Sequence, residues 1–152
     1  MADNTLLAVS YYINGVNFRA SADRLANDLE IDSDGKPLRL TAIPYYLLVS
    51  HGAELFLKAE LLKRGFDEKD MKKFDYRHDL SALLSELRDR GVSVSSPTIQ
   101  VVDGLNAPHK LHILRYAQFF GDGVNLYLPT LPAVNNMLDE LFSLTRISAQ
   151  GV

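Results

Sequence analysis

The sequence contains no cysteine and no tryptophan among its 152 residues. The lack of cysteine excludes a disulfide scaffold, a thiolate zinc site, an iron–sulfur cluster and a cysteine nucleophile. Neither sign of charge is in large excess, because the chain has 19 Asp and Glu and 16 Lys and Arg. This balance argues against a generally basic surface for nucleic acid. With 47% apolar and 23% charged residues the composition is that of a globular protein, and we expect a single domain over residues 1–152.

Long apolar runs are absent as well. The longest apolar stretches are a few residues, far below the ~20 needed to span a bilayer. The opening residues, Met1 to Asn4, have neither the cationic region nor the apolar run of a secretory signal. We therefore expect a cytoplasmic protein without a membrane segment.

Apolar residues recur with helical spacing in five segments. A stripe from Leu7 to Leu29 keeps its phase across Asn14-Gly15, which predicts one long first helix despite a cost of about 1 kcal/mol for the glycine. Four more helices are expected from near Pro44 to Arg64, after Asp79, from near Asn106 to before Gly121, and after Thr130.

No convincing set of alternating strands accompanies these helices. The extended structure that we expect is a short β-like arm within residues 93–102. The predicted fold class is all-α, an antiparallel up-and-down bundle of four to five helices.

Three polar residues lie on the apolar face of the helix expected from Pro44. His51, Glu54 and Lys58 are spaced i, i+3, i+7 and share a helical arc with leucines of the same segment. Unpaired charges on such a face would cost several kcal/mol, so these groups are expected to pair or to line a cleft. The i, i+4 spacing of Glu54 and Lys58 allows a direct ion pair. Two interpretations stay open, a buried polar network that fixes helix packing and a polar pocket that binds a ligand.

The segment His51-Gly52-Ala53-Glu54-Leu55-Phe56-Leu57-Lys58 and its continuation to Gly65 resemble the second helix of HEPN domains (higher eukaryotes and prokaryotes nucleotide-binding). The run from His78 to Leu84 resembles the sequel, and Leu105-Asn106 and Arg115-Tyr116 are similar to positions in bacterial HEPN-like proteins. The resemblance covers about residues 43–116. It implies a bundle of four or five helices, commonly dimeric, with relatives in RNA cleavage, toxin–antitoxin and phage-defence systems.

The ribonuclease branch of that family carries an Arg followed, after four to six residues, by a His. No Arg of this chain has a His at that spacing, and the window after Arg115 holds Phe120, Gly121 and Asp122 instead. The chain therefore lacks the family's RNase signature.

Other polar residues have two interpretations each. His109 and His112 share a helical face, and a partly exposed surface is favoured over a metal pair. His78 either packs at a helix start or approaches the His51–Glu54–Lys58 patch. Arg115 and Tyr116 either pair and pack in the core or hold a phosphate and stack on a base. A di-iron site would need a second Glu/His unit, so we expect no metal and no cofactor.

The sequence thus predicts a HEPN-like binding or interaction module, with a nucleotide or an RNA end as ligand and without RNase chemistry. Its candidate patch comprises His51, Glu54, Lys58, His78, Arg115 and Tyr116. The alternative is an enzyme, a metal-independent endoribonuclease toxin in which histidines act as acid and base. The expected partners are a second copy of the chain in a homodimer and a nucleotidyltransferase or antitoxin.

Overall fold

The computed structural model describes residues 4–36, 39–73, 76–111 and 128–150. Within these ranges the secondary structure is helical, with six helices and no sheet: α1 (Asn4–Asn27), α2 (Arg39–Lys63), α3 (Glu68–Met71), α4 (Leu80–Asp89), α5 (Ser96–Lys110) and α6 (Leu131–Gln150). The predicted all-α helical bundle is confirmed. None of the described helices combines the length and apolar character needed to cross a bilayer.

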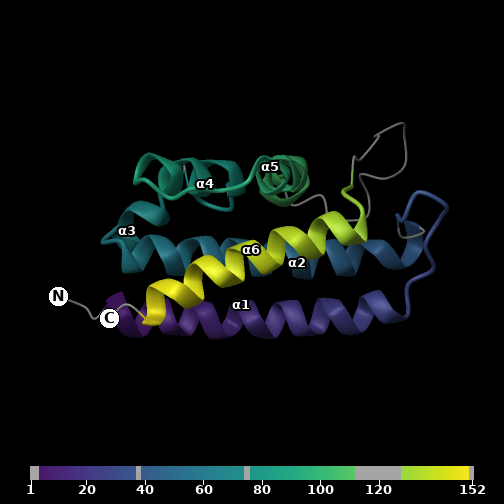
Figure 1. Ribbon diagram of the computed structural model, residues 1–152, viewed down its shortest axis with the longest axis horizontal. Helices are drawn as coiled ribbons and strands as arrows, with labels where there is room; N and C mark the ends of the chain where they lie inside the picture. Colours follow the sequence, from purple (N-terminus) through teal and green to yellow (C-terminus); the bar gives the residue numbers. More distant parts are fainter. Residues whose placement is uncertain (1–3, 37–38, 74–75, 112–127, 151–152) are drawn as a thin grey trace.

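Helix α2 lies at the centre of the bundle. It packs against α1 along one side and against α4, α5 and α6 on the others, and Figure 1 shows α6 crossing over it. In the same view α1 and α2 lie lengthwise, whereas α5 is seen nearly end-on (Figure 1). Because neighbours surround α2, even Glu60, which the sequence places opposite His51, is buried.

Helix α1 is continuous across Asn14-Gly15, as its apolar stripe predicts. The glycine serves a close contact between helices. A Cβ atom built on Gly15 would lie 2.9 Å from Cε1 of Phe56 in α2, closer than a stable packing distance. The chain tolerates glycine in this helix because α2 approaches at that point.

The start of α5 corrects two predictions. The β-like arm in residues 93–102 is wrong, since a helix begins at Ser96 with Ser95 as its N-cap. From α6, Glu140 accepts hydrogen bonds from the Ser95 amide at 2.8 Å, the Ser95 hydroxyl at 2.6 Å and the Thr98 hydroxyl. These bonds hold the first turn in place. Ser95 as cap and Pro97 in the first turn are helix-start signals in the sequence, and they favour a helix over the β-like arm.

The helix start predicted near Asn106 is also wrong, because residues 106–110 continue a helix that begins earlier. Asn106 and Pro108 belong to the last turns of α5, which ends at Lys110. The remainder of that expected helix, which includes His112, Arg115 and Tyr116, lies outside the described residues.

The other boundaries follow the sequence closely. Helix α2 begins at Arg39, ahead of the expected start at Pro44, and ends at Lys63 before Gly65, whose φ of 84° suits glycine. Helix α4 begins after Asp79, whose carboxylate accepts a hydrogen bond from the Ala82 amide at 2.9 Å. Helix α6 begins at Leu131, directly after Thr130 as predicted.

Candidate functional site

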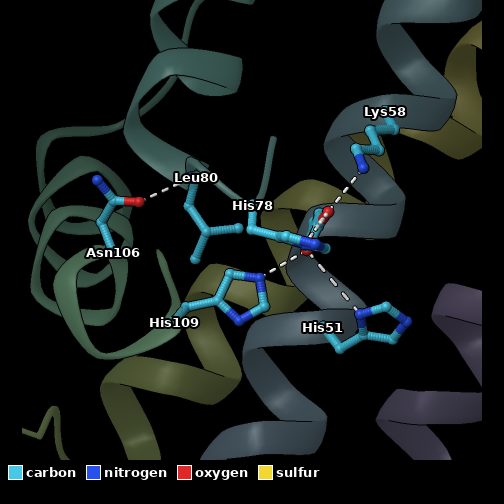
Figure 2. Close-up of polar contacts among 7 residues, drawn as sticks. His51, Lys58, His78, Leu80, Asn106 and His109 are labelled. Carbon is cyan, nitrogen blue, oxygen red and sulfur yellow. Dashed lines mark hydrogen bonds and ion pairs between the residues drawn. The ribbon is translucent and has the colours of Figure 1, made fainter. Parts of the chain in front are cut away.

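The candidate site is centred on the carboxylate of Glu54 in the middle of α2. Its side chain is 2% exposed, and it is surrounded by side chains from three parts of the fold. Figure 2 shows His51 and Lys58 on α2, His78 ahead of α4, and His109 on α5, with their polar ends directed toward a common centre. We call Glu54, Lys58, His78 and His109 the Glu54 cluster.

Each oxygen of Glu54 is engaged. Lys58 Nζ donates to Oε1 at 2.6 Å, and His78 Nδ1 lies 3.1 Å from the same oxygen. His109 Nε2 lies 2.6 Å from Oε2. An ionised carboxylate only accepts hydrogen bonds, so both imidazole nitrogens donate in these contacts. The i, i+4 ion pair expected between Glu54 and Lys58 is therefore present.

Electrostatics keep Glu54 ionised. Burial by itself would raise the pKa of the carboxyl, but the hydrogen bonds from His109 and Lys58 and their nearby charge lower this pKa far below its usual value. The cluster is therefore built around a permanent negative charge, held at the junction of α2, α4 and α5.

His78 reaches Glu54 through an unusual backbone conformation. Its φ of 56° lies in the left-handed region, which non-glycine residues adopt rarely and at a cost of about 1 kcal/mol or more. The next residues are fixed by α5, because Asn106 Oδ1 accepts a hydrogen bond from the Leu80 amide at 2.8 Å (Figure 2). Asn106 Nδ2 also donates to Asp79 at 3.0 Å. These bonds hold the start of α4, and with it the turn that directs His78 inward. Of the two interpretations of His78, the structure therefore favours the one in which this residue approaches the patch formed by His51, Glu54 and Lys58.

His51 stands at the edge of the cluster. Its Nδ1 is 3.9 Å from Glu54 Oε2, beyond hydrogen-bond distance, and its ring packs edge-on against Phe18 of α1 with centroids 4.5 Å apart. The side chains of His51, His78 and Lys58 are 30%, 24% and 16% exposed, so solvent meets the cluster on the side of these three residues.

His109 corrects a prediction. It was expected on a partly exposed face, yet its side chain is 2% exposed and bonded to Glu54. The reason is the true start of α5. Once the helix is counted from Ser96, Val102, Leu105 and His109 follow at i, i+3, i+7 on one buried face. A correct helix boundary would have found this histidine. Of the other candidates, Arg115 and Tyr116 lie outside the described residues.

The arrangement combines a buried anion, two imidazoles in direct contact with it, and a lysine at the solvent side. Such a cluster can hold a phosphate through the ammonium and imidazole N–H donors at its exposed edge, position an imidazole for proton transfer, or ligate a metal ion. No family model matches this chain, and comparisons with curated proteins and with solved structures find no match.

Proposed function

We propose that this protein is a HEPN-like helical binding module whose Glu54 cluster and neighbouring His51 take a phosphate-bearing ligand, a nucleotide or an RNA end. The observation that carries the proposal is the exposed edge of the cluster, where Lys58, His78 and His51 surround a buried carboxylate. Ammonium and imidazole N–H groups are strong donors to phosphate oxygens. The resemblance of residues 43–116 to HEPN domains supports the same class of ligand, and the missing Arg–His spacing argues for binding without the family's RNase chemistry.

Glu54 has a positioning role in this proposal. Its carboxylate fixes the orientation of Lys58 and His78, both of which bond to Oε1. A phosphate that arrives from solvent then meets donors whose conformations are already restricted, which lowers the entropic cost of binding.

The test is isothermal calorimetry of the pure protein with nucleoside mono-, di- and triphosphates and with short single-stranded RNAs. Lys58→Met should lose the binding. Lys63→Met is the matched control, because Lys63 is on the same helix but donates to the Thr145 carbonyl at 3.0 Å, away from the cluster. Binding that is absent from the wild type, or equal in wild type and Lys58→Met, contradicts the proposal.

One observation favours a second function, the metal-independent endoribonuclease. The contact of His78 Nδ1 with a buried carboxylate is the geometry that orients an imidazole for general base catalysis. His78 would take the proton of a ribose 2′-hydroxyl, whose oxygen then bonds to the adjacent phosphorus. The 5′-oxygen would leave with a proton from His51, and Lys58 would stabilise the phosphorane. The products are a 2′,3′-cyclic phosphate and a 5′-hydroxyl.

Incubation of total RNA with the pure protein, in the presence of a chelator, tests this second function. Cleavage by the wild type that His78→Gln and His51→Gln abolish is the expected result. Equal cleavage by all three proteins, or no cleavage, eliminates the ribonuclease.

A homodimer is part of the proposal. Leu6, Val9 and Ile13 are exposed on α1 and lie at i, i+3, i+7, which forms an apolar stripe on its outer face. A second copy packed on this stripe would leave the edge of the Glu54 cluster to the ligand or to a nucleotidyltransferase or antitoxin partner. Light scattering should give a dimer that Ile13→Asp converts to a monomer; a monomeric wild type refutes it.

A further inference from the structure

Glu54, His78 and His109 bring their ligand atoms within 4.8 Å of one another. They come from α2, from the turn before α4 and from α5, so only the folded chain assembles them. Two imidazole nitrogens and one carboxylate are the protein donors of catalytic zinc centres, and of non-haem iron sites.

The dimensions of the group suit a metal ion. Ligand bonds of about 2.1 Å at tetrahedral angles place ligand atoms about 3.4 Å apart. Here a single oxygen of Glu54, Oε2, lies 3.3 Å from His78 Nδ1 and 2.6 Å from His109 Nε2. Widening the shorter of these contacts by about 0.8 Å would give the required spacing. Each of the two nitrogens must also release the proton that it donates to Glu54, to solvent or to the other nitrogen of its ring, before it can ligate an ion. The left-handed backbone of His78 already directs its ring toward Glu54.

Lys58 is the group that opposes a cation at this position. Its ammonium donates to Oε1 of Glu54 at 2.6 Å and therefore competes with a metal for the carboxylate. Its side chain is 16% exposed and has a flexible four-carbon stem, so the ammonium can turn to solvent when an ion enters. The side of the cluster that Lys58 leaves can then supply a water as the fourth ligand.

We propose that Glu54, His78 and His109 form a binding site for a divalent transition-metal ion of the zinc type, which Lys58 gates by competing for Glu54. The site does not depend on the proposed phosphate ligand, because its third ligand is the buried His109 and its readout requires no nucleotide. Competition by Lys58 predicts that a Lys58 variant, although it loses a contact within the cluster, gains affinity for the metal ion.

Co²⁺ serves as the probe, since its visible absorption reports nitrogen and oxygen ligands in a low-coordinate site. Titration of the chelator-treated protein should saturate at one equivalent, and Zn²⁺ should abolish the band. Lys58→Met should bind at least about tenfold more tightly, which corresponds to about 1.4 kcal/mol.

Two variants should lose the band, Glu54→Gln and His109→Gln; the glutamine at 109 retains an amide donor for Glu54 but is a poor ligand for these metals. Glu60→Gln is the matched control, because Glu60 is a second buried carboxylate of α2 that pairs with Arg64 instead. Circular dichroism verifies that each variant is folded. Absence of the band in both wild type and Lys58→Met overturns the proposal, as does a band of equal strength in His109→Gln.

Discussion

The two buried carboxylates of α2 should differ sharply in their contribution to stability. Glu54→Gln removes the negative charge opposite Lys58 and His109, and the side chain of His109 is only 2% exposed. Breaking a buried charge cluster from one side costs about 3–5 kcal/mol. Glu60→Gln removes the partner of Arg64, whose side chain is 39% exposed and stays hydrated, so the loss should be about 1 kcal/mol or less.

Urea denaturation and thermal unfolding at neutral pH, both followed by circular dichroism, measure the two losses under matched conditions. For a chain of this size 1 kcal/mol corresponds to about 2–4 °C in melting temperature. Glu54→Gln should therefore lower the melting temperature by about 10 °C, and Glu60→Gln by a few degrees. The slope of the urea transition should not change, because neither substitution alters the surface exposed on unfolding.

Equal losses in the two variants would refute the reasoning. They would mean that the surroundings of Glu54 relax to hydrate Lys58 and His109 as readily as Arg64 is hydrated. A Glu54→Gln protein as stable as the wild type would likewise show that the cluster contributes no net stability.

Three further predictions concern the packing around the site. Gly15→Ala should lower stability by about 1–3 kcal/mol in denaturant unfolding, although alanine favours helix, because the buried ring of Phe56 must move. Asn106→Ala should cost about 1–2 kcal/mol, since the Leu80 amide loses its acceptor, and an unchanged unfolding midpoint would contradict this. Burial raises the pKa of Glu140, but hydroxyl and amide donors at the start of α5 lower it overall below 4.5. The ionised carboxylate therefore stabilises the fold fully above the pKa of the unfolded chain, and this stabilisation is lost as the pH falls through the lower pKa of the folded state. The difference in unfolding free energy between wild type and Glu140→Gln should accordingly shrink in acid.

Much of the fold follows from local signals in the sequence. The stripe of α1, the leucines of α4 and the glycines that end α2 and α4 are patterns within a single helix, and they predict those helices with their ends correct to within a few residues. The start of α5 is the exception. Its cap residue Ser95 is held by Glu140 of α6, a contact that local sequence does not reveal. Pro97 in its first turn is equally compatible with a loop.

The sequence alone determined that His51, Glu54 and Lys58 share one face of a helix, because helical geometry fixes neighbours at i+3, i+4 and i+7. It also determined that none of these 152 residues can supply a thiolate, since the sequence contains no cysteine. Only the tertiary structure decided which groups meet that face. His78 and His109 are far from Glu54 in sequence, and their contact depends on the packing of α4 and α5 against α2, which no local pattern encodes.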